Sequence, residues 1–196
     1  SAVSPDWLTT TTKSSFITLR SVKITLCFLL ILATGCAKKP AIVDEESNSN
    51  LAIDAEELVY QGNYLGAARI FSGLAKDSTK VRYLALAALA YDDAGDFVTA
   101  ENYLEKATSS KLEEKPLGVA KSCFALRDGL AERAFSLAMR VDRRQLTDFP
   151  LGKLLRCLGK AAYQTKRYRL AAEALGLAFS YPIPPSQILA LSKITW

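Results

Sequence analysis

The sequence of 196 residues contains no histidine, four cysteines and a single methionine. The lack of histidine excludes histidine-based acid–base catalysis, the Ser-His-Asp and Cys-His triads, and zinc sites that use histidine. The chain also has no CxxC pair, no glycine-rich phosphate loop of the GxxxxGK[ST] or GxGxxG type, and no GxSxG nucleophile motif. We therefore expect a protein that is not an enzyme and that binds neither a metal nor an organic cofactor.

Strand-forming segments are scarce, because runs of β-branched residues are short and Ala and Leu dominate residues 51–180. The hydrophobic fraction of 49% is high enough for a packed core and argues against disorder. These observations predict an all-α fold, and the length suits one domain.

Two short stretches share a pattern at a separation of 33 residues. Residues 62–67 read GNYLGA and residues 95–100 read GDFVTA, and a third copy without the aromatic residue, GLAERA, follows at 129–134. Glycine ends a helix in the left-handed conformation without steric cost, and the next residue, Asn63 or Asp96, can cap the following helix. A period of about 34 residues with this pattern is typical of stacked helical hairpins.

On these residues the chain resembles the tetratricopeptide repeat (TPR) family over residues 51–185. The resemblance implies an α-solenoid of about four TPR-like helical hairpins with a C-terminal capping helix at 186–196, which is either truncated or followed by a further domain. In the first hairpin we expect helices over 51–61 and 64–76. In the fourth, Lys166 replaces the turn glycine, so a strained or differently shaped turn is expected. A generic helical bundle is the competing interpretation.

The N-terminal part contains an uncharged run, ITLCFLLILATGC, at residues 24–36. The run is too short to span a bilayer and fits the apolar region of a secretory signal. Its end, LATGC, resembles the lipobox of bacterial lipoproteins, which implies cleavage before Cys36 and attachment of lipid to this cysteine. The expected parts are thus an upstream segment with a signal peptide (1–35) and a lipidated cysteine with a flexible tether (36–50).

The residue after the lipidation site is Ala37, in place of the aspartate that is typical of lipoproteins retained at the inner membrane. The resemblance therefore implies an outer-membrane protein, held by its lipid and facing the periplasm of a Gram-negative bacterium. Three alternatives stay open. They are an ordinary signal peptide with an accidental cysteine, a buried helix, and an uncleaved run in an inner-membrane protein.

Charge is distributed unevenly, with a net charge of −6 over residues 36–114 and +9 over residues 115–196. Lys153, Arg156 and Lys160 follow the i, i+3, i+7 spacing and so share a helix face. In TPR proteins the first helix of each unit lines a concave groove. The resemblance thus predicts a partner-binding groove with Lys153, Arg156, Lys160, Tyr163 and Gln164. A basic groove suits an acidic protein segment or a terminal carboxylate, or an anionic lipid or glycan, whereas nucleic acid is not expected; a solvated face is the alternative.

Three pairs of residues need separate predictions. Cys123 and Cys157 are expected on neighbouring helices, where a disulfide is allowed in an oxidising compartment. Two buried free thiols are the expected state, because the spacing does not ensure the Cα separation that a disulfide needs. The adjacent carboxylates Asp92 and Asp93, and likewise Glu113 and Glu114, should diverge on a helix and be solvated.

Together these features predict a lipid-anchored TPR scaffold that binds and positions a protein partner during assembly of a cell-envelope complex. The chain is similar to pilus-assembly (pilotin-like) lipoproteins, which are the first expectation, and to lipoproteins of outer-membrane assembly. The alternative is an accessory TPR domain of a truncated envelope enzyme or of a peptidoglycan-synthase activator.

Overall fold

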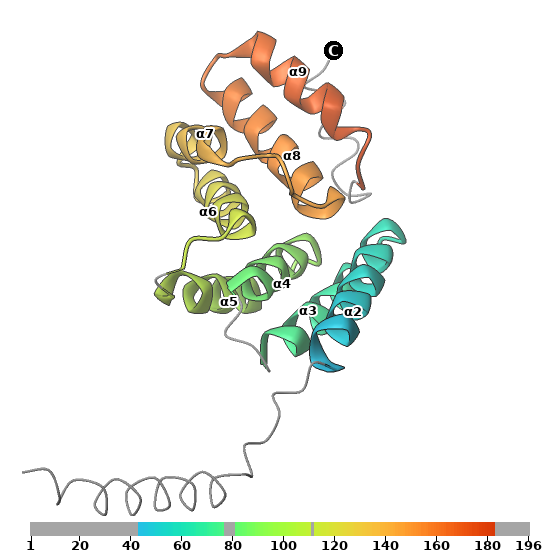
Figure 1. Ribbon diagram of the computed structural model, residues 1–196. Coiled ribbons are helices and arrows are strands. Elements are labelled where there is room, and N and C mark those ends of the chain that lie inside the picture. Colours follow the sequence, from blue (N-terminus) through green and yellow to red (C-terminus); the bar gives the residue numbers. More distant parts are fainter. Residues whose placement is uncertain (1–42, 77–80, 111, 183–196) are drawn as a thin grey trace, which may run out of the picture. The chain divides into compact units, whose positions relative to one another are not determined.

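The computed structural model describes residues 43–76, 81–110 and 112–182, all within one compact unit that begins at Val43. In these ranges all regular structure is helical and no strand occurs, so the expected all-α class is confirmed. The helices, labelled in Figure 1, are α2 (Val43–Tyr60), α3 (Tyr64–Lys76), α4 (Val81–Asp93), α5 (Phe97–Ser109), α6 (Lys115–Arg127), α7 (Ala131–Arg140), α8 (Asp148–Gln164) and α9 (Tyr168–Ala178).

Four tight turns share one backbone geometry; they join α2 to α3, α4 to α5, α6 to α7 and α8 to α9. One residue in each turn has a positive φ, which is 77° at Gly62, 83° at Gly95, 79° at Gly129 and 62° at Lys166. The N–H of this residue donates to the carbonyl three residues back, and the next N–H donates to the carbonyl five residues back. This is the Schellman pattern of helix ends. The three predicted glycine turns are confirmed, and the fourth turn has the same shape with Lys166 in the position of glycine.

The residue that follows each positive-φ residue precedes the next helix. Asn63 Oδ1 accepts a hydrogen bond from the N–H of Gly66 at 3.0 Å, and Asp96 Oδ1 accepts one from the N–H of Thr99 at 3.2 Å. The two expected helix caps are therefore confirmed. An alanine lies four residues after the cap position in every case, and each is at most 2% exposed: Ala67, Ala100, Ala134 and Ala171. These small side chains allow the two helices of each pair to pack closely.

Helix α2 begins at Val43, before the expected start at residue 51. Residues 43–50, which the sequence predicts to be part of the tether, are therefore helical. The polar stretch SNSN at 47–50 has weak helix propensity, which favours the tether prediction. A helix that already exists can extend, however, because each added residue gains a hydrogen bond without a new nucleation cost.

Several predictions fall on other parts of the chain. The signal peptide (1–35), Cys36, the first part of the tether and the capping helix (186–196) lie outside the described residues. Among the described helices, none combines the length and the apolar character needed to cross a bilayer.

Helices also pack between the turn-connected pairs. Helix α3 packs on α4, α4 on α6, and α6 on α8. The start of α8 additionally contacts α2 and α3. The ring of Phe149 stacks on that of Phe71 with 6.1 Å between centroids, and Tyr60 Oη donates to Asp148 Oδ2 at 2.6 Å. In a simple linear stack each unit touches only its neighbours, so these contacts are a feature that the repeat pattern does not predict. They bring α8 against α4, where the candidate site lies.

Candidate functional site

A cleft of about 420 Å³ lies between the C-terminal end of α4, the C-terminal half of α6 and one face of α8. Its charged lining residues are Asp92, Asp93, Arg127, Lys153, Arg156 and Lys160. Four cations and two carboxylates therefore line the cleft, and one of the cations, Arg127, also pairs with Glu101 outside the lining. We call this site the cationic cleft.

Four of the five residues predicted for the partner groove line this cleft, namely Lys153, Arg156, Lys160 and Gln164. They follow one another along one face of α8, as their spacing predicts. The fifth residue, Tyr163, is not among the lining residues. Tyr163 is 43% exposed, and its ring packs edge-on against that of Tyr168, with 5.7 Å between centroids.

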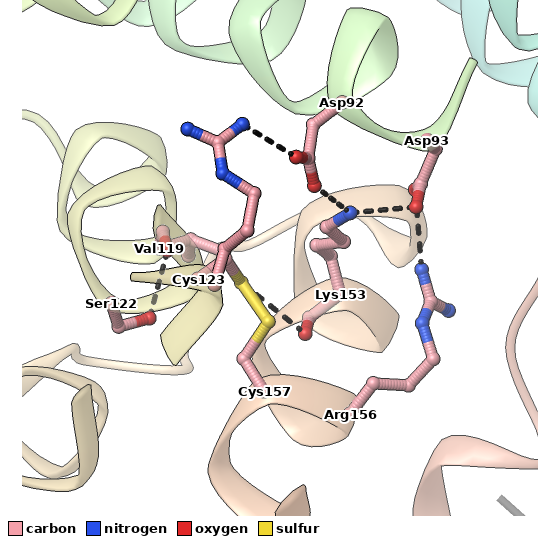
Figure 2. The surroundings of a disulfide bond; sticks show 9 residues. Asp92, Asp93, Val119, Ser122, Cys123, Lys153, Arg156 and Cys157 are labelled. Atoms are coloured by element: carbon pink, nitrogen blue, oxygen red, sulfur yellow. Dashed lines mark hydrogen bonds and ion pairs between the residues drawn. A yellow bond between two sulfur atoms is a disulfide. The ribbon is translucent and has the colours of Figure 1, made fainter. Parts of the chain in front are cut away.

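Lys153 is the centre of a buried ion-pair network (Figure 2). Its Nζ donates to Asp92 Oδ2 at 2.8 Å and to Asp93 Oδ1 at 2.6 Å. The side chains of Lys153 and Asp93 are 4% and 0% exposed. The prediction that the two carboxylates diverge into solvent is therefore wrong, because α8 places an ammonium group between them. The ammonium also offsets the unfavourable position of two carboxylates at the negative end of the α4 dipole.

Arg156 is the largest fully buried side chain among the described residues. One Nη group donates to the carbonyl of Pro182, and the other donates to Asp93 Oδ2 at 3.4 Å. Its Nε is buried without a hydrogen-bond partner in the described part of the chain. Burial lowers the pKa of the guanidinium, although Asp93 and Tyr64 act in the opposite direction. Arginine nevertheless stays charged in proteins. Arg156 is therefore a buried cation whose Nε donor is unsatisfied among the described residues.

Lys160 is the least buried of the three α8 cations, and its ammonium has no ion pair within the described residues. Burial lowers the pKa of this ammonium, and the neighbouring charges of Lys153 and Arg156 lower it further, against a smaller opposing effect of Asp93 and Asp92. A negative group that enters the cleft would therefore be attracted first to Lys160.

Arg127 of α6 lies at the outer side of the cleft. Its Nη1 donates to Asp92 Oδ1 at 3.2 Å, and its Nη2 pairs with Glu101, whose side chain is 64% exposed. The guanidinium also lies 4.4 Å from the ring centroid of Phe124 and 5.4 Å from that of Phe97. Arg127 thus connects α4, α5 and α6, and the exposed pair with Glu101 contributes little to stability.

A disulfide joins Cys123 of α6 to Cys157 of α8 in the wall of the cleft (Figure 2). The two Cα atoms are 5.3 Å apart, within the usual range for disulfides. The expectation of two free thiols is therefore wrong. The two cysteines are 34 residues apart, which equals the expected repeat length and is the one sequence signal that favours facing positions on adjacent helices.

No group of three or more histidine, cysteine or acidic residues is placed to hold a metal ion in the described ranges. The polar groups that line the cleft are the ammonium, guanidinium and amide groups of α6 and α8 and the carboxylates of Asp92 and Asp93. Comparison of the chain with protein-family models, with curated proteins and with solved structures finds no match.

Proposed function

We propose that the protein is a lipid-anchored TPR-like scaffold that holds a protein partner during assembly of a cell-envelope complex. The cationic cleft binds an acidic side chain or a terminal carboxylate of this partner. The observation that carries the proposal is Lys160, whose ammonium lines the cleft beside Lys153 and Arg156 and has no acidic partner among the described residues.

The TPR-like arrangement is supported by the four turns with one hydrogen-bond pattern. The first three turn glycines are separated by 33 and 34 residues, and the fourth turn follows after 37. Helices α4, α6 and α8, which would be the first helices of successive hairpins, pack on one another. Such packing is expected when the first helices line one concave face.

The lipid anchor is supported by the lipobox-like LATGC at residues 32–36. Because α2 begins at Val43, only six residues (37–42) separate Cys36 from the helical unit. Even a fully extended chain of this length reaches only about 20 Å. We therefore propose a scaffold held close to the periplasmic surface of the outer membrane, and not one on a long tether.

Recognition in the cleft would depend mainly on Lys160 and Gln164. A partner carboxylate would accept hydrogen bonds from the ammonium and from the side-chain amide, while Lys153 stays bonded to Asp92 and Asp93. The new counter-charge would also oppose the effect that lowers the pKa of Lys160. A charge-assisted hydrogen bond of this kind contributes about 1.5–3 kcal/mol.

A binding assay with fluorescein-labelled peptides that end in Glu-Glu tests the cleft. Lys160→Met should weaken binding about ten- to a hundredfold, and added salt should weaken binding to the native protein. The matched control is Arg133→Met, which removes an exposed cation of α7 that has no ion pair in the described residues. Equal affinity of the native protein and the Lys160 variant would reject the cleft as the binding site.

The anchor is tested separately by metabolic labelling with palmitate. The native chain should take up the label and fractionate with the outer membrane, whereas Cys36→Ala should do neither. Uptake of label by the Cys36→Ala chain would reject lipidation at this residue without affecting the proposal for the cleft.

A further inference from the structure

A second hollow lies near the N-terminal end of α4, away from the cationic cleft at its C-terminal end. It consists of two cavities of about 410 and 510 Å³ that share the lining residues Arg82, Glu114 and Thr147. Helix α2, the start of α4, the segment 112–116 and the start of α8 form its walls. We call this hollow the acidic groove.

Lys115 lies at the edge of the acidic groove, but its charge is already neutralised. An ammonium group has three N–H donors. Those of Lys115 go to Asp142 Oδ2 at 2.8 Å, to the Arg144 carbonyl at 2.8 Å and to Gln145 Oε1 at 3.1 Å. Lys115 therefore has no donor left for the carboxylates of the groove.

Three carboxylates line the groove, those of Glu56, Glu113 and Glu114. Glu56 accepts a hydrogen bond from Thr147 Oγ1. The side chains of Glu113 and Glu114 make no hydrogen bond or ion pair within the described residues. Since Arg82 is the remaining cation of the lining, three carboxylates face one available guanidinium, and the groove is negative in a protein whose formal net charge is +5.

Exposed aliphatic side chains border these carboxylates. Ile53 of α2 is 64% exposed and Leu112 is 59% exposed, and each lines one of the two cavities. Leu86, which lines the same cavity as Leu112, is buried and adds apolar surface to it. Apolar surface gathered in a hollow and rimmed by polar groups is typical of an interaction site.

We propose that the acidic groove is a second docking surface, which binds a protein segment that carries a lysine or arginine flanked by aliphatic side chains. The cation of the segment pairs with Glu113 and Glu114, and its aliphatic side chains pack on Ile53 and Leu112. Charge complementarity identifies this occupant, because the same carboxylates repel nucleic acid, anionic lipid and acidic peptides. The protein would then hold two segments of opposite charge, one in each hollow.

Fluorescence anisotropy with the purified full chain tests this proposal. The probe is a fluorescein-labelled peptide of alternating Lys and Leu, and the comparison peptide alternates Glu and Leu at the same length. The Lys–Leu peptide should bind in the acidic groove despite the positive net charge of the protein, and salt should weaken this binding. No binding of the Lys–Leu peptide would overturn the proposal.

Substitutions in the acidic groove test whether the Lys–Leu peptide binds there. The double change Glu113→Gln and Glu114→Gln should weaken the Lys–Leu peptide about three- to thirtyfold, and Leu112→Ser should weaken it further. Glu105→Gln is the matched control, since Glu105 is an exposed carboxylate of α5 outside the groove. An equal effect of the control variant would overturn the proposal. Circular dichroism checks that each variant is folded.

Sedimentation of the purified chain alone tests whether the occupant of the acidic groove is a different protein or a second copy of this chain. The proposal expects the chain to sediment at the same rate with and without the two Glu changes. If the native chain associates with itself and the double variant does not, the occupant is a second copy, and the proposal of a separate basic partner is overturned.

Discussion

The charge of Asp93 should be the most important single contribution to stability in the cationic cleft. Its fully buried carboxylate accepts from Lys153 at 2.6 Å and from Arg156 at 3.4 Å. Asp93→Asn keeps the shape of the side chain but removes the negative charge. Two buried cations are then left with less compensation, and we expect a large loss of stability.

The magnitude follows from the partners that remain. Removal of one partner of a buried ion pair typically costs about 3–5 kcal/mol. Because Lys153 keeps Asp92 at 2.8 Å, the expected cost of Asp93→Asn is near the lower limit, about 3 kcal/mol. Lys153→Met should cost only about 1–2 kcal/mol, since Asp93 retains Arg156 and Asp92 retains Arg127.

Urea unfolding of the purified protein at neutral pH, followed by far-ultraviolet circular dichroism, measures these free energies. The double variant should cost about 1–3 kcal/mol less than the sum of the single variants, because both changes remove the same interaction. Asp54→Asn is the control, since Asp54 is exposed on α2 and should matter by less than about 0.5 kcal/mol. Strict additivity, or a cost of Asp93→Asn below about 1 kcal/mol, would refute the reasoning.

Four further predictions concern the disulfide, a turn, a tyrosine and the cleft lysine. Cys157→Ser should lower the free energy of unfolding by about 4 kcal/mol, the loop-entropy value for a separation of 34 residues, in the same urea assay. Lys166→Gly should stabilise the protein by about 1 kcal/mol, because a φ of 62° strains lysine but not glycine; a lower melting temperature would contradict this. The hydrogen bond to Asp148 raises the pKa of Tyr60 from 10.0 to about 12. The contribution of this hydrogen bond to stability is present below the ordinary pKa of tyrosine and is lost as the pH rises toward 12. In an ultraviolet titration, Tyr60→Phe should remove the tyrosine ionisation that occurs at the highest pH. Acidic peptides should bind more weakly as the pH rises through the lowered pKa of Lys160, since the ammonium then loses its proton and its charge. Binding that does not change with pH, measured by anisotropy, would exclude Lys160 as the group that binds the peptide.

The uneven charge of the two halves of the chain contributes to the fold. Asp92 and Asp93 come from the acidic half, and Lys153 and Arg156 come from the basic half. Their pairing holds the end of α4 against α8. Two of the three α8 cations predicted to face a partner, Lys153 and Arg156, therefore form ion pairs inside the protein, whereas Lys160 has none among the described residues.

The positions of the helical turns are determined by the sequence itself, because the chemistry of a turn is local. Gly62, Gly95 and Gly129 adopt positive φ where the pattern predicts it, and Asn63 and Asp96 cap the following helices. The all-α class follows equally from composition. Lipidation at residue 36 and the choice of a partner stay predictions, since the first lies outside the described residues and the second depends on another molecule.

Only the tertiary structure decided which distant side chains meet. Lys153 and Asp93 are 60 residues apart, and their contact depends on how the crossing angles of several successive helices combine, which no local pattern specifies. The same holds for the disulfide, for the contacts of α8 with α2, and for Lys166, whose strained φ the packing of α8 on α9 outweighs. Helical spacing placed Lys153, Arg156 and Lys160 on one face, but packing decided that the first two are buried and that Lys160 has no ion pair in the described part of the chain.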